Sequence, residues 1–238
     1  MSAVERGLDP NKAIKSYFQD PDWLFKTGLG GLFNSAAFLL LFIHQILIPL
    51  TFCLSALNVG YMLRVMRHKM ADEDSLLPKW NDLQDLFISG LTWIAVFTGQ
   101  MLLILSVVTI SLLVGGGIGS LYALSSGFLI WASITVAATS LIWLSVWFFS
   151  SMIMTNFAEK ERTAAAFDLV TVFRLFKQEP LQFIQAWLLS IGLHWLALIV
   201  PVISIIGLPL VPMSLFVAGN VSATLFAQVW ALAKEEVL

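Results

Sequence analysis

The sequence predicts an all-α, polytopic transmembrane helical bundle, and three observations support this prediction. Of the 238 residues, 58% are hydrophobic. Only 12% are charged, about half of the roughly 25% that soluble domains carry. Lys, Arg, Asp and Glu are absent from three long stretches, which are residues 27–63, 86–158 and 180–233. A water-soluble domain needs polar surface around its core, so we expect lipid to surround these stretches.

The uncharged stretches predict six transmembrane spans arranged as three hairpins. A span needs about 20 apolar residues, and each stretch has a turn signal near its middle: Ile48-Pro49, Gly115–Gly119, and Pro201 with Pro209 and Pro212. Glycine loosens a helix and proline removes one of its donors. We expect hairpins at about 29–67, 88–155 and 181–232, with spans at 29–48, 50–67, 88–113, 120–155, 181–200 and 211–232. The alternative makes residues 27–63 one span followed by an interfacial helix, which gives five spans.

The charged segments predict the rest of the organisation. We expect a cytoplasmic or interfacial N-terminal segment at 1–28, a transmembrane domain at 29–233, interfacial loops at 68–87 and 156–180, and a cytoplasmic tail at 234–238. With three hairpins, all 13 Lys and Arg lie on one face of the membrane. The positive-inside rule makes this face cytoplasmic.

Amphipathic helices are expected on that cytoplasmic face, ahead of the hairpins. Ahead of the second hairpin, Pro78 can open a helix that places Trp80, Leu83, Phe87 and Leu91 on one side. Ahead of the third, a polar stripe that includes Asp168 follows an otherwise apolar helix from Thr163. Ahead of the first, apolar residues 23–25 precede Lys26.

Several short motifs occur together in a recognisable order. They are Asp20-Pro21-Asp22-Trp23, Gly60-Tyr61-Met62-Leu63-Arg64-Val65 with Arg67, Leu77-Pro78-Lys79-Trp80-Asn81-Asp82, Leu86-Phe87, Gly90-Leu91 and Ala165-Ala166-Phe167-Asp168. In this order the chain resembles the family named domain of unknown function 4013, over nearly its whole length. Asn81 departs from the acidic residue that the family pattern leads us to expect. The resemblance implies an integral membrane protein of prokaryotic type, in the cytoplasmic (inner) or an internal membrane, and it implies no activity.

Five residues next to the second span are candidates for a clamp at the membrane interface: Arg64, Arg67, Trp80, Asp82 and Asp85. The two arginines leave the span three residues apart and precede a segment that carries the two aspartates. Ion pairs between them would hold residues 64–91 against the membrane surface. The alternative is that both arginines extend to lipid phosphates, as basic residues at the end of a span usually do.

His44 and His194 are the only histidines inside the predicted spans, and they are the candidate ligands of a cofactor. Counted from the charged ends of their spans, both lie beyond the middle of the bilayer at comparable depth, as a haem or chlorophyll-type pigment would require. Neither belongs to a spacing motif, however, and a lone histidine in a span usually makes only hydrogen bonds. We therefore predict no cofactor and no metal site.

Four glutamines in the spans are candidates for the lining of a polar cavity: Gln45, Gln100, Gln185 and Gln228. The alternative is that they form hydrogen bonds between helices, which contribute about 0.6 kcal/mol each. No charged residue lies deep inside a predicted span. This argues against a proton-coupled transporter or a pathway for charged ions.

The remaining features exclude several classes of function. A net charge of −2 gives no basic excess for nucleic acid, and the single cysteine, Cys53, excludes an internal disulfide and a multi-cysteine zinc site. No catalytic constellation is recognisable, so no enzyme is predicted. We predict a non-catalytic accessory, scaffold or assembly subunit of a membrane complex, and the alternative is a channel or transporter for a neutral or lipidic solute. The expected partners are membrane lipids, and other membrane subunits or a second copy of the chain.

Overall fold

The structure is a computed structural model, and it describes residues 7–43, 45–72, 74–121, 125–204 and 207–235. These residues form α-helices and short 3-10 helices, with no strand among them. The α-helices are α1 (Pro10–Phe18), α2 (Trp23–Ile43), α3 (Ile48–Ala71), α4 (Leu83–Leu121), α5 (Ser125–Lys160), α6 (Leu169–Gln178), α7 (Pro180–Ile203) and α8 (Val211–Glu235). Three 3-10 helices span Gln45–Leu47, Thr163–Phe167 and Leu208–Leu210.

Six of the described helices are long and apolar enough to cross a membrane, as the sequence predicts. They are α2, α3, α4, α5, α7 and α8. The five-span alternative required one span over residues 27–63, but α2 ends at Ile43 and α3 begins at Ile48. The chain is thus a multi-pass, all-α membrane protein.

Two of the three predicted turns lie where proline signals them. Pro49 occupies the first turn of α3, where its missing N–H needs no partner. Residues 204–210 connect α7 to α8, and there the Gly207 amide donates to the Ser204 hydroxyl and the Leu210 amide to the Gly207 carbonyl. Pro49 and Pro212 thus lie in the first turns of α3 and α8, and Pro201 lies inside α7, two residues before its end.

The prediction of a turn at Gly115–Gly119 is wrong, because α4 continues through these glycines to Leu121. The connection to α5 falls at residues 122–124, outside the described residues. Glycine costs a helix only about 1 kcal/mol relative to alanine. A backbone that leaves the helix in lipid loses hydrogen bonds that cost several kcal/mol each, so the helix persists.

The predicted leader helix at Pro78 is also wrong, since residues 74–82 contain no helix and α4 begins at Leu83. Asp82 has a φ of 52°, a left-handed conformation that aspartate tolerates and that interrupts a helix. Its carboxylate then accepts the amide of Asp85, 3.3 Å away. Residues 23–25 likewise form the first turn of α2. The separate helices ahead of a span are α1, before α2, and α6, before α7.

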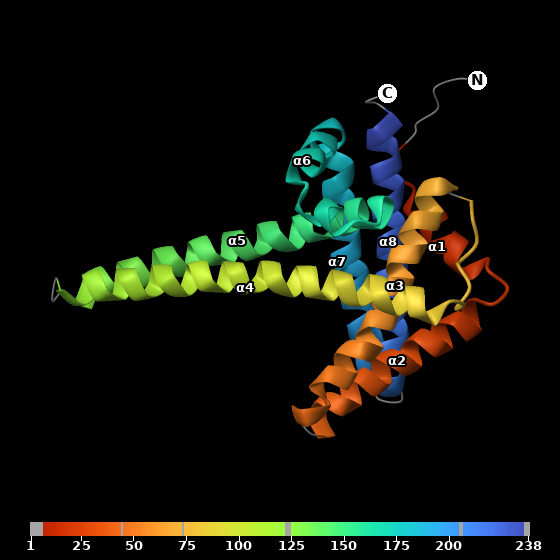
Figure 1. Cartoon of the computed structure of the whole chain (residues 1–238), viewed down its shortest axis with the longest axis horizontal. Coiled ribbons are helices and arrows are strands. Elements are labelled where there is room, and N and C mark those ends of the chain that lie inside the picture. Colours follow the sequence, from red (N-terminus) through yellow and green to blue (C-terminus); the bar gives the residue numbers. More distant parts are fainter. Residues whose placement is uncertain (1–6, 44, 73, 122–124, 205–206, 236–238) are drawn as a thin grey trace. The chain divides into compact units, whose positions relative to one another are not determined.

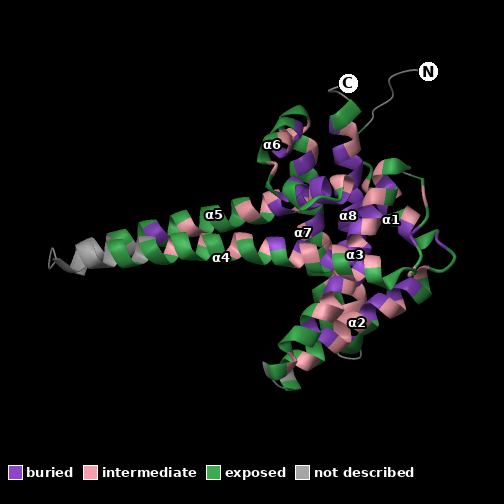
Figure 2. Ribbon diagram, viewed as in Figure 1, coloured by how far each residue is buried: buried purple, intermediate pink, exposed green. Residues whose placement is uncertain are grey.

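The chain divides into two compact units. The base unit comprises Met1–Ile94 and Ser151–Leu238, and the hairpin unit comprises Ala95–Ser150. In the base unit α8 contacts α1, α2, α3, α6 and α7. Every residue from Ala218 to Trp230 is buried (Figure 2). The centre of the base unit is therefore a transmembrane helix that other helices surround (Figure 1).

Within the base unit α3 and α4 cross at two glycines, Gly60 and Gly90. A Cβ atom on Gly60 would lie 1.9 Å from the carbonyl oxygen of Leu86. A Cβ atom on Gly90 would lie 1.8 Å from the carbonyl oxygen of Ala56. The two backbones are thus in direct contact, which only small residues allow at a membrane helix crossing.

The hairpin unit has almost no interior of its own. Among its described side chains only Val96, Thr135 and Ser150 are buried. Hydroxyl groups along it donate to the carbonyl four residues earlier in their own helix, as Ser106, Thr139 and Ser145 do. These hydroxyl groups are therefore satisfied within their own helices. Most of the described residues of the unit are exposed or half-buried (Figure 2), and many of the exposed side chains are large and apolar.

Candidate functional site

The charged ends of the helices meet at one end of the base unit. Ion pairs and hydrogen bonds join α3 to α4, α3 to the end of α5, and α5 to α8 through Arg64–Asp85, Arg67–Glu161 and Lys234–Glu159. The start of α2 joins the segment before α4, and the start of α7 joins the N-terminal segment, through Lys26–Leu77 and Gln182–Leu8. The starts of α2, α4 and α7 and the ends of α3, α5 and α8 therefore lie together.

The predicted clamp residues divide into two groups. Arg64 donates to the carbonyl and the side-chain oxygen of Asn81, at 2.7 and 3.0 Å, and pairs with Asp85 at 2.9 Å. Arg67 pairs with Glu161 instead. The Asp82 carboxylate accepts the amide of Asp85, while the backbone carbonyl of Asp82 accepts Arg64 at 3.4 Å. Arg64 thus holds residues 79–85 against α3. That this segment also lies on a membrane surface stays a prediction.

Trp80 is held by aromatic rings from three spans. Its ring stacks on Tyr61 with centroids 4.3 Å apart, and its centroid lies 5.5 Å from Phe33 and 6.0 Å from Phe216. The Tyr61 hydroxyl donates to the carbonyl of Pro78 at 2.8 Å. The segment before α4 is therefore fixed by packing on α2, α3 and α8, which explains its irregular conformation.

A buried ion pair that sequence reasoning missed lies at the start of α2. Lys26 and Asp20 are 2.7 Å apart, and their side chains are 7% and 2% exposed. The Lys26 ammonium also donates to the carbonyl of Leu77 at 2.9 Å. Nearby, the Tyr17 and Thr27 hydroxyls are 2.7 Å apart, and burial raises the pKa of Tyr17 to about 12. The only signal in the sequence is an aspartate six residues before a lysine at the edge of an apolar run.

The two predicted histidine ligands are not brought together among the described residues. His44 lies outside the described residues. His194 is exposed on α7, and its Nδ1 lies 2.7 Å from the carbonyl oxygen of Ser190, one turn earlier. The described part of the chain contains no group of His, Cys, Asp and Glu that could hold a metal ion. The prediction on cofactors stays a prediction.

The four glutamines differ in their surroundings. The side chain of Gln45 lies outside the described part of the chain, and Gln100 is half-buried in the hairpin unit. Gln185 is exposed on α7, away from the buried side that Phe183 and Ala186 form. Gln228 is buried on the central helix α8. Of the two glutamines described in the base unit, one is therefore exposed and the other buried, and they do not share the lining of one polar cavity.

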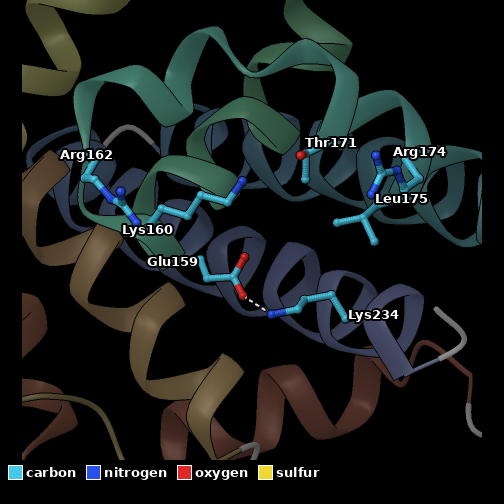
Figure 3. A pocket seen from close by; sticks show the side chains of 7 residues that line it. All are labelled: Glu159, Lys160, Arg162, Thr171, Arg174, Leu175 and Lys234. Carbon is cyan, nitrogen blue, oxygen red and sulfur yellow. Dashed lines mark hydrogen bonds and ion pairs between the residues drawn. The ribbon is translucent and has the colours of Figure 1, made fainter. Parts of the chain in front are cut away.

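A pocket with four basic side chains is a candidate binding site that the sequence did not reveal. It lies in the base unit between the ends of α5 and α8 and the side of α6, and its volume is about 460 Å³. Its lining consists of Glu159, Lys160, Arg162, Thr171, Arg174, Leu175 and Lys234 (Figure 3). Residues 159–162, 171–175 and 234 become neighbours only when α6 folds back on α8, so no local spacing could have predicted this pocket.

Two carboxylates position part of this basic pocket. Glu159 accepts the Trp230 indole at 3.0 Å and pairs with Lys234. Asp168 caps α6 by accepting the amide and the hydroxyl of Thr171, at 3.1 and 2.7 Å, and pairs with Lys160 at 2.9 Å. Hydrogen bonds from Lys160 and Thr171 lower the pKa of Asp168 to about 2. Both carboxylates are therefore engaged by protein groups.

A second candidate surface is the outside of the hairpin unit. Large apolar side chains are exposed along both of its helices, and among them Leu103, Leu113 and Val136 are 68%, 71% and 63% exposed. The unit carries no Asp, Glu, Lys, Arg or His between residues 95 and 150. Its exposed apolar side chains are suited to contact with lipid or with apolar protein surfaces.

Comparison with known proteins confirms the resemblance seen in the sequence. A family model described as "Protein of unknown function (DUF4013)" matches residues 41–211, which is more than half of the chain. No curated protein and no solved structure matches the chain. The matched range includes the α3–α4 glycine crossing, the Arg64 contacts and the whole hairpin unit.

Proposed function

The chain belongs to the DUF4013 family of proteins of unknown function, and we propose that it is a non-catalytic accessory subunit of a membrane complex. In this proposal the base unit anchors the protein in the bilayer. The hairpin unit packs against the spans of a second membrane protein.

The observation that carries this proposal is the length and exposure of the hairpin. The helices α2, α3, α7 and α8 have 21 to 25 residues, which is about 32 to 38 Å and matches a hydrocarbon core of about 30 Å. The helices α4 and α5 have 39 and 36 residues, about 58 and 54 Å. An uncharged helix that is longer than the hydrocarbon core is thick must either tilt strongly or be surrounded by apolar protein where it leaves the core.

Small exposed residues support protein contact over tilt alone. Ser133, Ala137 and Ser140 are exposed on α5 and recur at positions i, i+4 and i+7, which places them on one side of the helix. Small side chains let helix backbones approach closely, and association in lipid depends on such packing. A surface that only met lipid would have no need of them.

A non-catalytic role and a cytoplasmic orientation are supported by the charged groups of the base unit. Five of the described carboxylates at the charged end are engaged in ion pairs: Asp20, Asp85, Glu159, Glu161 and Asp168. Such groups are poor general bases because their lone pairs are occupied. We propose that this end faces the cytoplasm of a prokaryotic cell, in the cytoplasmic or an internal membrane, because its basic residues follow the positive-inside rule.

The alternative of a channel or transporter for a neutral or lipidic solute has less support. It required the glutamines to line one cavity, whereas Gln185 is exposed on α7 and Gln228 is buried on α8. The interior of the base unit is filled by α8, whose residues from Ala218 to Trp230 are all buried. A scaffold role needs no such cavity.

Site-specific photocrosslinking in native membranes tests the proposal. A photoreactive amino acid replaces Leu103, Leu113 or Val136 in the hairpin unit, and matched controls replace Leu196 or Ile203 of α7, which are 59% and 76% exposed. We expect discrete protein adducts from the hairpin positions and lipid adducts from α7. Lipid adducts alone at all five positions would reject the docking role. An adduct with twice the mass of the chain would mean that the partner of the hairpin unit is another copy of this chain.

A further inference from the structure

We propose that the basic pocket binds the phosphate group of an anionic phospholipid at the membrane boundary. The pocket is the one formed by the ends of α5 and α8 and the side of α6 (Figure 3). This inference is independent of the docking role of the hairpin unit, because every residue it uses belongs to the base unit.

The charge of the pocket favours an anion. Four basic side chains line it. Among the described residues, Glu159 in the lining and the adjoining Asp168 are the only carboxylates that pair with them. Four positive charges against two negative ones leave a formal excess of two. Phosphate oxygens accept strong, charge-assisted hydrogen bonds from guanidinium groups, which can offer two donors in one plane.

The excess positive charge resides on two arginines. Lys160 and Lys234 are paired with Asp168 and Glu159, but Arg162 and Arg174 have no ion pair among the described residues. Figure 3 shows these two arginines on opposite sides of the pocket, with Lys160 and Thr171 between them. Two guanidinium groups on either side of a cavity can contact one phosphate from two directions.

The lysines are held in place before any ligand arrives. Asp168 fixes Lys160 while it caps α6, and Glu159 fixes Lys234 while it accepts the Trp230 indole. Because the pKa of Asp168 is lowered to about 2, this carboxylate stays ionised at any physiological pH. The ligand therefore has to order few side chains, which lowers the entropic cost of binding.

A lipid phosphate fits better than free phosphate because of what surrounds the pocket. Helices α5 and α8 are long and apolar enough to cross a membrane, and the pocket lies at their charged ends, where our proposal places the lipid headgroups. Helix α6 lines the pocket with Thr171 and Arg174, while Val170 and Phe173 on its other sides are 71% and 45% exposed. Basic pockets between membrane helices at this depth bind phosphorylated headgroups, and the exposed apolar side chains of α6 can contact the acyl chains.

The test compares two double variants of the full-length protein that each remove two positive charges. Arg162→Gln with Arg174→Gln removes the two unpaired guanidinium groups. Lys79→Gln with Lys177→Gln removes the same charge from exposed residues outside the pocket, and Lys177 is on the same helix as Arg174. Each protein is purified in detergent, and binding of phosphatidylglycerol, phosphatidylcholine and inorganic phosphate is measured by native mass spectrometry and titration. Thermal unfolding verifies that the variants are folded.

We expect the unaltered protein to prefer phosphatidylglycerol to phosphatidylcholine and to bind inorganic phosphate weakly. The arginine variant should lose about tenfold in affinity for phosphatidylglycerol, the size of one charge-assisted interaction. The lysine variant should bind as the unaltered protein does. Equal losses in both variants would mean that net charge alone attracts the lipid, which overturns the site. Inorganic phosphate bound as tightly as the lipid would overturn the assignment to a lipid.

Discussion

The base unit and the hairpin unit are built from equally apolar helices, yet they use them in opposite ways. Every residue of α8 from Ala218 to Trp230 is buried in the base unit, whereas among the described side chains of the hairpin unit only Val96, Thr135 and Ser150 are buried. Lipid is as apolar as leucine, so hydrophobicity alone does not determine which helices pack together. In the base unit the contacts depend on glycine crossings, aromatic clusters and buried polar pairs. The described residues of the hairpin unit include an aromatic contact between Phe148 and Phe149, but no glycine crossing and no ion pair.

The largest effect is expected when the buried charge pair of the base unit is broken. Lys26→Met leaves Asp20 buried without a counterion, and the loss of one partner of such a pair costs about 3–5 kcal/mol. Thermal or denaturant unfolding in detergent measures it. Lys15→Met, at an exposed site on α1, should change stability by less than about 0.5 kcal/mol. Adding Asp20→Asn to Lys26→Met should recover part of the loss, and no recovery would contradict the role of the pair.

Two tryptophans compare the units directly. Trp80→Ala removes a ring that stacks on Tyr61 and contacts Phe33 and Phe216, and it should cost about 3 kcal/mol. Trp143 on α5 is 50% exposed, and Trp143→Ala should cost much less in the isolated protein. Both are measured by unfolding in the same detergent. Equal costs would show that the hairpin unit is packed in a way that its exposure does not reveal.

Two glycines of the same helix provide a smaller and more local comparison. Gly90→Ala on α4 forces a Cβ atom against the backbone of α3, and overpacking of this kind costs about 1–3 kcal/mol. Gly99 is nine residues further along α4, in the hairpin unit, and a Cβ atom there meets nothing within 4 Å. Gly99→Ala should therefore stabilise the helix by about 0.5–1 kcal/mol. A stabilising Gly90→Ala would contradict the close crossing of α3 and α4.

The six spans were predictable because their signal is local. A stretch without charge that is long enough to cross lipid twice can be recognised without information about its neighbours. Pro49, in the first turn of α3, and Pro201, two residues before the end of α7, lie next to two of the three turns. The turn predicted at Gly115–Gly119 was wrong because glycine disfavours a helix only mildly, whereas in lipid the loss of backbone hydrogen bonds would cost more than these glycines do. The surrounding lipid therefore determines that α4 continues, despite the helix-breaking tendency of glycine.

The contacts of the candidate sites were less predictable because they depend on which spans are neighbours. Arg64 and Asp85 flank one loop, so their pairing could be proposed from sequence. Arg67 also has an aspartate nearby in the sequence, Asp82. It pairs instead with Glu161, which is 94 residues away in the sequence and follows the end of α5. The pocket around Arg162, Arg174 and Lys234 depends on the same packing of distant segments. The spacing of residues along the sequence predicts the helices. The contacts of the candidate sites follow only from knowing which helices are neighbours.

The smallest effect is expected from acid, and it should arise only in the base unit, since residues 95–150 contain no ionisable Asp, Glu or His. The pKa of Asp168 is lowered from its ordinary value of 3.8 to about 2 by hydrogen bonds from Lys160 and Thr171. A carboxyl group with a lowered pKa stabilises the fold above its unfolded-state pKa and loses this contribution as pH falls through its folded-state value. Unfolding of the unaltered protein and of Asp168→Asn should therefore differ by a constant amount from pH 7 down to about 4 and converge toward about 2. If the stabilities of the two proteins already converged between pH 7 and 5, Asp168 would not hold Lys160 and the start of α6. Lys160 would then not be fixed in the basic pocket.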